Sequence, residues 1–387
     1  MLKQHHPWKV DRVSFEKEIP SVTSTTVSPS PRQAASVHPD PGAFRRRWGL
    51  PFLFFVLMIA FALSLSLGSV RIPLREVVAA LFGWESANPV WPRIIHLIRL
   101  PKALTAVLAG AALSASGLQM QTLFRNPLAD SSVLGINAGA SLGVALVVLS
   151  VSATGSVFLG LGLLGNLGLV AAASLGSATV LSVVLGVSRK VQSALTLLIL
   201  GLMFGYVTGA LVSLLIYFSI PEQVQAYLVW TFGSFGGVTW GQMKVMAPAL
   251  LAGLVIAHAL IKPMNALLLG EAYARSLGLS VKRARFWTLI SASLLAGGTT
   301  AFCGPIAFLG LAVPHLCRSL FQTSDHRVLM PAVALMGGAL ALLADLAAQM
   351  PGGRTILPLN AVTSLIGAPV VIWVILRGRT HREALAP

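Results

Sequence analysis

Uncharged apolar runs of about 20 residues recur along this chain and limit what it can fold into. Residues 169–187, 194–217 and 246–261 are three such runs. A bilayer core about 30 Å thick needs roughly 20 apolar residues per helix, and backbone groups in lipid must bond within their own segment. Only 10% of the residues are charged and the mean hydropathy is +0.80, whereas soluble domains carry about 25% charged residues. The sequence therefore predicts an all-α polytopic membrane protein.

About ten transmembrane helices are expected. The predicted spans are residues 50–70, 95–123, 131–151, 157–187, 192–218, 245–261, 286–303, 307–320, 328–348 and 357–376. Spans two to five and spans seven to ten form two four-helix blocks that start on opposite sides of the membrane, an arrangement that allows an inverted repeat.

The two ends of the chain differ from the apolar part. Residues 1–44 are rich in Ser, Thr, Pro and His, so we expect a disordered cytoplasmic N-terminal tail. Residues 45–379 are expected to form the transmembrane domain, and residues 380–387 a cytoplasmic C-terminal tail.

The net charge of +16 is interpreted as membrane topology and not as a nucleic-acid surface. Arg45, Arg46 and Arg47 stand directly before the first span, which favours a cytoplasmic N-terminus. Ten spans then place most of the 28 Lys and Arg residues on the cytoplasmic side. The seven on the outer side are Arg71, Arg75, Arg93, Arg99, Lys102, Lys244 and Arg354. We therefore expect a multi-pass inner-membrane protein with both termini in the cytoplasm and no nucleic-acid partner.

Two predicted outer segments carry interfacial features. Residues 71–92 include a stretch at 73–82 that is expected to form a short amphipathic helix. Residues 221–243 contain Trp230 and Trp240, as is typical of a helix and turn at the membrane surface.

The sequence contains few residues that could form a catalytic site. Asp345 is the one acidic residue clearly within a span; that is too few for an ion-coupled relay, and a helix-packing hydrogen bond is the simpler interpretation. Residues 139–143 read Gly-Ala-Ser-Leu-Gly and match a hydrolase pattern, but they lie inside a span, where close helix packing is the better interpretation. Neither zinc-ligand spacing nor a phosphate-binding loop occurs in the sequence. We expect no metal, no cofactor and no enzymatic activity, so energy must come from a partner.

The longest internal loop, residues 263–285, contains a candidate docking element. Residues 272–277 are expected to form a short helix with Glu271 at its N-terminal end, where the helix dipole favours an anion. Gly278 is placed to end this helix. Three of its side chains are small or apolar although the loop should be in water: Ala272, Ala274 and Leu277. Such a helix can enter a groove on a soluble subunit, and an ordinary structured loop is an equal alternative.

Four stretches, taken in order, resemble the permease subunits of type II ABC importers for iron-siderophores, haem and cobalamin. They are Ile-Arg-Leu-Pro-Lys at 98–102 with the small-residue helix that follows, Phe-Arg-Asn-Pro-Leu-Ala-Asp at 124–130, Gly-Glu through Gly-Leu at 270–279, and Gly-Pro-Ile-Ala-Phe-Leu-Gly-Leu at 304–311 with Pro314, His315 and Asp-His-Arg at 325–327. The resemblance covers about residues 50–379.

This resemblance implies a fold of about ten helices per subunit and a set of partners. A second permease, identical or a paralogue, would complete a central path through the lipid. Two ATPase subunits would dock from the cytoplasm, and an extracytoplasmic binding protein would deliver the substrate. Ferric siderophore is the first substrate expected, because it is the commonest in the family, and cobalamin and haem follow. The alternative from another class is a stand-alone ion-coupled carrier.

The resemblance also assigns roles to single residues. The ATPase-coupling residues are Gly270, Glu271, Ala272, Ala274, Arg275, Leu277 and Gly278. The inner-gate residues are Asn126, Leu128, Gln192 and Ser193. Arg99 and Lys102 would meet acidic groups of the binding protein, with interfacial snorkelling as the alternative. Gln349 occupies the family's second basic docking position, after the ninth helix, and the nearby Arg354 would compensate for it.

Overall fold

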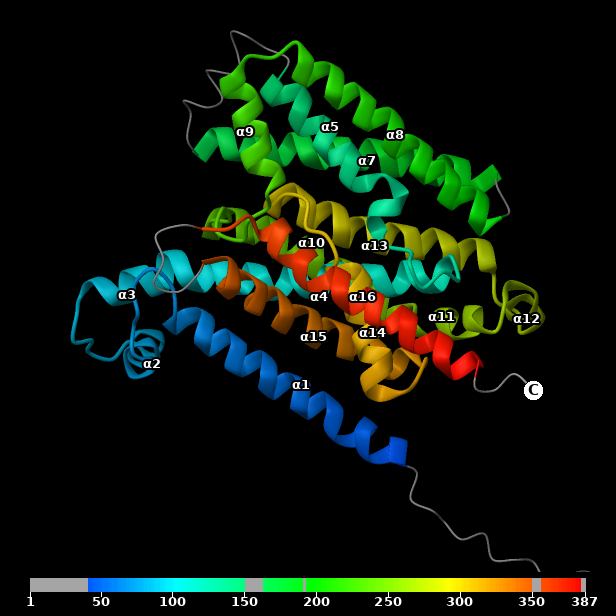
Figure 1. Cartoon of the computed structure of the whole chain (residues 1–387), viewed down its shortest axis with the longest axis horizontal. Coiled ribbons are helices and arrows are strands. Elements are labelled where there is room, and N and C mark those ends of the chain that lie inside the picture. Colours follow the sequence, from blue (N-terminus) through cyan, green and yellow to red (C-terminus); the bar gives the residue numbers. More distant parts are fainter. Residues whose placement is uncertain (1–40, 150–162, 191–192, 350–355, 384–387) are drawn as a thin grey trace, which may run out of the picture. The chain divides into compact units, whose positions relative to one another are not determined.

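Helices account for the regular structure in this computed structural model, which describes residues 41–149, 163–190, 193–349 and 356–383. No strand occurs among these residues. Among the described residues, seven helices are long and apolar enough to cross a membrane, and three more carry shorter apolar stretches. They follow one another in the order of the predicted spans (Figure 1), so the predicted all-α polytopic membrane fold is confirmed.

The helices fall into three groups. The long apolar helices are α1 (Pro41–Ser66), α4 (Leu100–Leu123), α7 (Leu163–Lys190), α8 (Ala194–Tyr217), α10 (Trp240–Ala259), α13 (Val281–Cys303) and α15 (His326–Gln349). Those with shorter apolar stretches are α5 (Ile136–Leu149), α14 (Leu309–Phe321) and α16 (Leu359–Glu383). The remaining helical segments are α2 (Leu74–Phe82), α3 (Val90–Ile94), η1 (Ile95–Arg99), η2 (Ser131–Leu134), α9 (Pro221–Thr231), α11 (Ile261–Leu268) and α12 (Glu271–Ser276).

Several helices extend beyond their predicted spans. The segments α3 and η1 lead directly into α4, so the second crossing begins at Val90 and not at residue 95. Helix α1 begins at Pro41, within the predicted tail, and α16 continues to Glu383. A helix ends where its last turn is capped, and an apolar stretch does not mark that place. The rest of the predicted N-terminal tail, the first residues of the fourth span and residues 384–387 lie outside the described part of the chain.

The two predicted four-helix blocks, α4 to α8 and α13 to α16, have a matching layout. In each block the second helix is short and follows a non-helical break or a 3-10 turn. Helix α4 packs against α14 and α15, and α13 packs against α5 and α7. The first helix of each block therefore lies among the second and third helices of the other, in keeping with two related blocks.

Close contacts between backbones hold α4 to the second block. A Cβ atom on Gly110 would lie 2.2 Å from the carbonyl oxygen of Gly337 in α15. A Cβ on Gly117 would lie 1.8 Å from the carbonyl oxygen of Gly310 in α14. The hydrophobic effect does little to drive the association of helices in a membrane, because lipid tails are as apolar as the side chains. Van der Waals contacts from such close approach are therefore a main source of stabilisation.

The Gly-x-Ser-x-Gly segment serves the same purpose in the first block. A Cβ on Gly139 would lie 2.7 Å from the carbonyl oxygen of Gly176, and one on Gly143 would lie 2.1 Å from that of Ala172. Both partners belong to α7. The predicted helix-packing role of this segment is confirmed.

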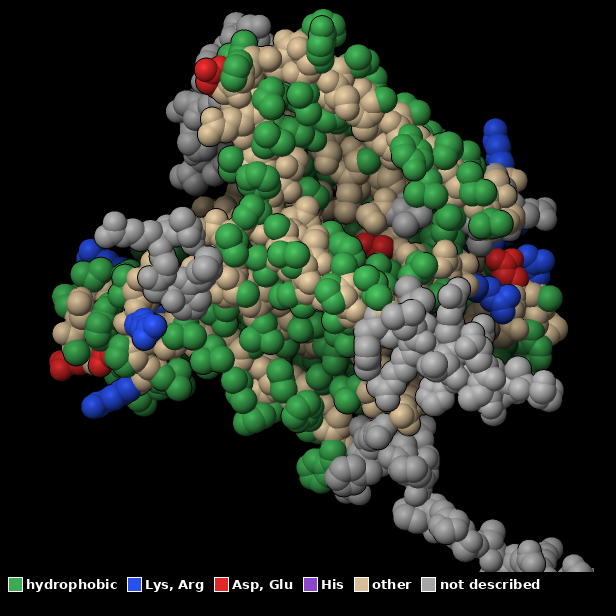
Figure 2. All heavy atoms as spheres, in the orientation of Figure 1, with side chains coloured by type: hydrophobic (Ala, Val, Ile, Leu, Met, Phe, Trp, Pro, Cys, Tyr) green, Lys and Arg blue, Asp and Glu red, His purple; other side chains and the backbone are tan. Residues whose placement is uncertain are grey.

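Apolar side chains cover most of the visible face in Figure 2, as expected of a surface in contact with lipid. Charged side chains gather at opposite ends of the long helices, over α2 and α3 at one end and over α11 and α12 at the other. We call these the α2 end and the α12 end. By the predicted topology, the α2 end faces outward and the α12 end faces the cytoplasm.

Candidate functional site

Helix α12 lies between two glycines at the α12 end. Gly270 has a φ of 113° and Gly278 a φ of 81°, conformations that residues with a Cβ rarely adopt. The amide of Gly278 donates to the carbonyl of Arg275 (2.9 Å), and the amide of Leu279 donates to that of Ala274 (3.0 Å). These two bonds form a Schellman ending, which stops the helix after little more than one turn.

Glu271 fastens this helix to the start of α13. Its carboxylate accepts hydrogen bonds from Arg285 (2.7 Å) and from Arg275 (3.1 Å). The Arg275 side chain is 61% exposed, so its pair with Glu271 contributes little. The Arg285 side chain is only 6% exposed, so its charge depends on Glu271 for compensation. Glu271 therefore fixes the orientation of α12 and also interacts favourably with the helix dipole at its N-terminal end.

Three large apolar side chains on and beside α12 are more than half exposed: Leu269 (63%), Tyr273 (53%) and Leu277 (62%). Ala274, by contrast, is fully buried. Since this end of the molecule carries charged groups and lies outside the apolar helices, exposed apolar side chains here indicate a contact surface. The structure thus brings the predicted coupling residues together on one short projecting element.

The turn after α4 reaches this element through Arg125. Arg125 has a φ of 49°, which is uncommon for a residue with a side chain. Its guanidinium donates to the carbonyl oxygen of Leu268 (3.3 Å), at the end of α11. The side-chain oxygen of Asn126 accepts from the backbone N–H of Leu128 (2.9 Å), a local bond typical of Asn in turns. Two predicted gate residues therefore share one tight turn that touches the α11–α12 junction.

Helix α14 supports the same turn from the second block. The Nε2 of His315 donates to the carbonyl oxygen of Pro127 (2.8 Å). Arg318 donates to the side-chain oxygen of Gln121, whose amide nitrogen donates to the carbonyl of Leu311 (3.2 Å). These bonds join two of the stretches on which the family resemblance rests, although they are more than 180 residues apart in sequence.

Asp130 ends the turn and caps η2. Its carboxylate accepts from the N–H (2.7 Å) and the hydroxyl (3.3 Å) of Ser131. A Cβ on Gly310 would lie 2.2 Å from this carboxylate, so Asp130 lies against the first turn of α14, whose dipole favours an anion. Burial raises the pKa of Asp130, and hydrogen bonds from Ser131 and Ser132 offset part of that rise. A cavity of about 240 Å³ opens beside it and is also lined by Asn137.

A buried histidine ties α15 to α4 and α11. The side-chain oxygen of Asn265 accepts from the backbone N–H (2.9 Å) and the Nδ1 (2.8 Å) of His326. The amide nitrogen of Asn265 donates to Asp325 (2.6 Å). The Nε2 of His326 lies 2.8 Å from the hydroxyl of Thr122, just before the gate turn. No local sequence pattern points to Asn265, because its partners Asp325 and His326 lie about 60 residues away.

The second predicted gate turn lies before α8. Ser193 caps this helix by accepting from the N–H of Thr196 (3.4 Å). Leu197, one turn further on, is buried in the same apolar cluster as Ala129 of the turn after α4. The two turns therefore border one cluster. Gln192 lies outside the described residues, and the gating role of all four residues stays a prediction.

At the α2 end, Arg99 is already engaged within the chain. Its side chain is buried, and its guanidinium donates to the carbonyl oxygens of Leu65 (2.6 Å) and Val70. These carbonyls belong to the end of α1 and the segment that follows it. Arg99 therefore holds α1 to the start of α4, and docking through this residue stays a prediction. Arg354 lies outside the described residues.

Lys102 forms an ion pair with Asp345 across the contact between α4 and α15. The Nζ lies 3.0 Å from the carboxylate, and the two side chains are 19% and 7% exposed. Gln349 also donates to this carboxylate (2.7 Å). The sequence identified all three residues separately but did not pair them. The pairing could have been predicted, because Asp345 is a single acid within a span, Lys102 stands at the start of another helix, and charges inside a membrane protein need partners.

The described residues contain no group of three or more His, Cys, Asp and Glu side chains that could hold a metal ion. The arrangement found here consists of turns, caps and ion pairs at the helix ends. It can transmit a mechanical change, because it joins a projecting helix to a turn at the end of α4.

Comparisons with known proteins match this picture. The sequence pattern of the FecCD transport family matches residues 56–377. The vitamin B12 import system permease protein BtuC of Klebsiella pneumoniae is 37% identical over 337 residues, which is 86% of this chain and 95% of the relative. The protein of the same name from Escherichia coli O9:H4 is 37% identical over 336 residues, with 86% and 96% covered. A solved structure, described as an inward-facing metal-chelate type ABC transporter, matches with a TM-score of 0.74 and 29% identity over 86% of this chain and 99% of its own.

The Lys102–Asp345 pair gives a test of the fold. Replacing Lys102 with Met leaves a buried carboxylate without its cation, so we expect the free energy of unfolding to fall by about 3–5 kcal/mol. The double variant Lys102→Met, Asp345→Leu should recover most of that loss. Thermal unfolding in detergent measures both, with Lys244→Met, an exposed lysine at the same end, as the control. A single Lys102 variant as stable as the parent protein would contradict the pairing.

Proposed function

The chain belongs to the FecCD transport family, and we propose that it is the membrane-spanning permease subunit of an ATP-driven importer that moves a metal chelate inward across the inner membrane. The observation that carries this proposal is α12, a short helix whose exposed Tyr273 and Leu277 project at the α12 end. The permease itself would contribute a path and its gates, without covalent chemistry.

Helix α12 fits a groove on a cytoplasmic ATPase subunit. Its exposed apolar side chains supply the contact area, and Glu271 holds them in a fixed direction through its pair with Arg285 (2.7 Å). A rigid element of this kind loses little conformational entropy on binding. In the importer, each of two permeases would present one such helix to one ATPase.

The bonds around α12 suggest how ATPase movement reaches the gate. Arg125 links the α11–α12 junction to the turn that holds Asn126 and Leu128. Asn265 links α11 to His326, which contacts Thr122 at the end of α4. A displacement of α12 would therefore change the position of the gate turn and shift the subunit between two states, as alternating access requires.

Of the two predicted docking residues Arg99 and Lys102, Lys102 is the more accessible. Its pair with Asp345 is still 19% exposed on the lysine side, whereas Arg99 is buried and bonded to backbone carbonyls. An acidic group of the extracytoplasmic binding protein would compete with Asp345 for Lys102. Docking would thereby loosen the contact between α4 and α15 on the side from which substrate arrives.

A corrinoid is the substrate that we place first, and a ferric siderophore or haem follows. Relatives that share 37% identity over 86% of this chain are named as vitamin B12 permeases. Other metal chelates are the second candidate substrates, because the solved relative is described as a metal-chelate type transporter. The siderophore that the family resemblance placed first has no support of its own among the residues.

Loss of the α12 surface should separate the permease from its ATPase. We expect Leu277→Asp and Glu271→Lys to weaken co-purification with the ATPase subunit by about tenfold or more, since either removes at least one well-formed contact. Insertion and helix content should not change. Lys282→Glu, a charge reversal on an exposed residue in the first turn of α13, is the control. A stable chain that never binds an ATPase, with uptake that an ionophore abolishes, would instead favour the stand-alone carrier.

Exchanging the two charges of the Lys102–Asp345 pair should separate docking from stability. In the variant Lys102→Asp, Asp345→Lys, the ion pair can reform, but its positive charge moves from α4 to α15. We expect near-normal thermal stability and about tenfold weaker binding of the binding protein, measured in nanodiscs. Unchanged binding would remove Lys102 from the docking surface.

Uptake of labelled compounds should decide the substrate class. In cells that lack their own permease, this chain with its ATPase and binding protein should restore accumulation of labelled cyanocobalamin. A Leu277→Asp variant serves as the transport-inactive control. Restored uptake of a ferric siderophore without any uptake of cobalamin would reverse the order of substrates and leave the importer proposal intact.

A further inference from the structure

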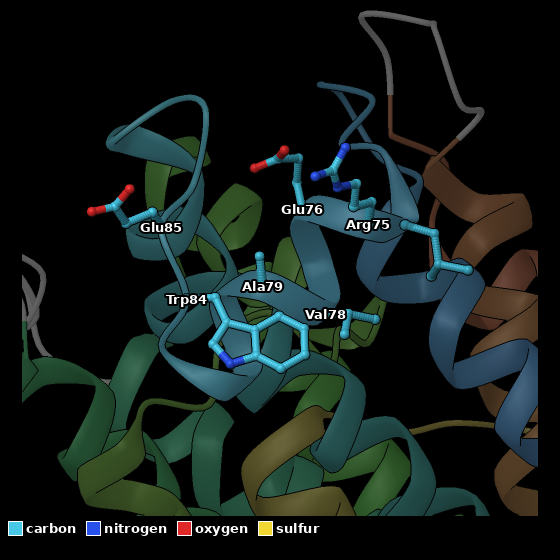
Figure 3. A pocket seen from close by; sticks show the side chains of 7 residues that line it. Arg75, Glu76, Val78, Ala79, Trp84 and Glu85 are labelled. Atoms are coloured by element: carbon cyan, nitrogen blue, oxygen red, sulfur yellow. The ribbon is translucent and has the colours of Figure 1, made fainter.

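A preformed pocket lies at the α2 end, between α2 and the loop that follows it (Figure 3). It has a volume of about 490 Å³. Val78, Ala79 and the indole of Trp84 form its apolar part. Arg75, Glu76 and Glu85 also line it, and in the view of Figure 3 Glu76 lies between Arg75 and Glu85. None of the roles proposed above uses these residues.

The helix ending fixes the position of Trp84. Gly83, with a φ of 72°, follows α2, and the amide of Trp84 donates to the carbonyl of Ala79 (2.8 Å). This is again a Schellman-type ending. Glu76 then holds the loop, because its carboxylate accepts from the hydroxyl of Ser86 (2.8 Å) and from the N–H of Ala87 (3.0 Å). The pocket wall is therefore rigid before any ligand arrives.

Arg75 and Glu85 are free to bind a ligand. Both side chains are exposed. Within the described part of the chain, neither forms an ion pair or a side-chain hydrogen bond, in contrast to Glu76. A ligand that carries one negative and one positive group, with an apolar part between or beside them, would match this pocket.

The side chains around the pocket indicate that it lies at a membrane surface and not in bulk water. Large apolar side chains are exposed all around it, including Leu74 (53%), Phe82 (69%), Trp84 (64%) and Leu97 (66%). The rings of Phe82 and Trp84 stack with their centroids 5.4 Å apart, and Trp is enriched at the membrane–water interface. In water such a surface would be costly, whereas at the boundary of headgroups and acyl chains it is stabilising.

The segment is also held close to the end of the bilayer. Ser66, the last residue of α1, donates through its hydroxyl to the carbonyl of Ile72 (2.6 Å), just before α2. His96, at the start of the second crossing, bonds to the carbonyl of Ala80 in α2 (2.9 Å). Helix α2 is therefore anchored to the ends of two helices that are long and apolar enough to cross a membrane.

We propose that this pocket binds the headgroup of a phospholipid that has both a phosphate and a primary amine, namely a phosphatidylethanolamine. The phosphate bonds to the guanidinium of Arg75, and the ammonium group bonds to the carboxylate of Glu85. An acyl chain lies along Val78 and the Trp84 indole. Phosphatidylglycerol lacks the amine and phosphatidylcholine lacks its N–H donors, so both bind more weakly.

Native mass spectrometry of the full-length chain in detergent tests the site. Phosphatidylethanolamine and phosphatidylglycerol are titrated separately against the parent protein and the variants Arg75→Gln and Glu85→Gln. We expect each variant to bind phosphatidylethanolamine about tenfold more weakly, the loss expected for one charge-assisted hydrogen bond. Glu85→Gln should leave phosphatidylglycerol binding unchanged. The matched controls are Arg93→Gln and Glu222→Gln, which alter exposed residues outside the pocket.

A second measurement locates the lipid. Quenching of tryptophan fluorescence by brominated phosphatidylethanolamine is compared between the parent protein and Trp84→Phe, and the difference isolates Trp84 from the seven other tryptophans. We expect strong quenching of Trp84 that Arg75→Gln reduces. Equal lipid binding by the parent protein and an Arg75→Gln, Glu85→Gln double variant would overturn the proposal. Loss of binding-protein affinity in that variant, with lipid binding unchanged, would assign the pocket to the protein partner instead.

Discussion

The close contact of α4 with α14 and α15 is the constraint on which the other features depend. In lipid, association of helices must come from tight packing and buried hydrogen bonds. Gly110 and Gly117 bring the backbone of α4 so near its neighbours that no side chain would fit between them. Ser116 and Gln119 add bonds to the carbonyl of Ala292 (3.1 Å) and the hydroxyl of Ser291 (2.9 Å) of α13. One helix thereby joins both four-helix blocks.

Both halves of the candidate site are attached to the ends of this helix. Lys102 pairs with Asp345 near its beginning, and the turn with Asn126 follows its last residue. The helix has 24 residues, which corresponds to a length of about 36 Å. A rigid rod of this length can relate events at the two membrane surfaces, provided that its contacts with α14 and α15 have two stable arrangements.

Buried charged side chains differ from the exposed charged side chains of the pocket in whether they have partners. Asp345 is matched with Lys102 and Gln349, and Arg285 with Glu271, because an unmatched charge there would be costly. At the α2 end, Arg75 and Glu85 carry charge without a partner among the described residues, beside exposed aromatic rings. At the α12 end, the exposed apolar side chains on and beside α12 are not covered by other described residues. The surfaces left open at each end are those to which we assign lipid and protein partners.

Local sequence patterns were sufficient to predict the membrane class, the order of the apolar helices and the bounds of α12 to within about one residue. These properties depend on local composition: an apolar stretch must be helical in lipid, and Gly270 and Gly278 mark where a helix can begin and stop. The contacts between polar residues, in contrast, became known only from the packing of the helices. The pair of Lys102 with Asp345, the bond of His315 to Pro127 and the contacts of Asn265 join positions 60 to 243 residues apart. No local pattern encodes such contacts, because they arise from the crossing of helices whose approach is set by the size of a few side chains on each.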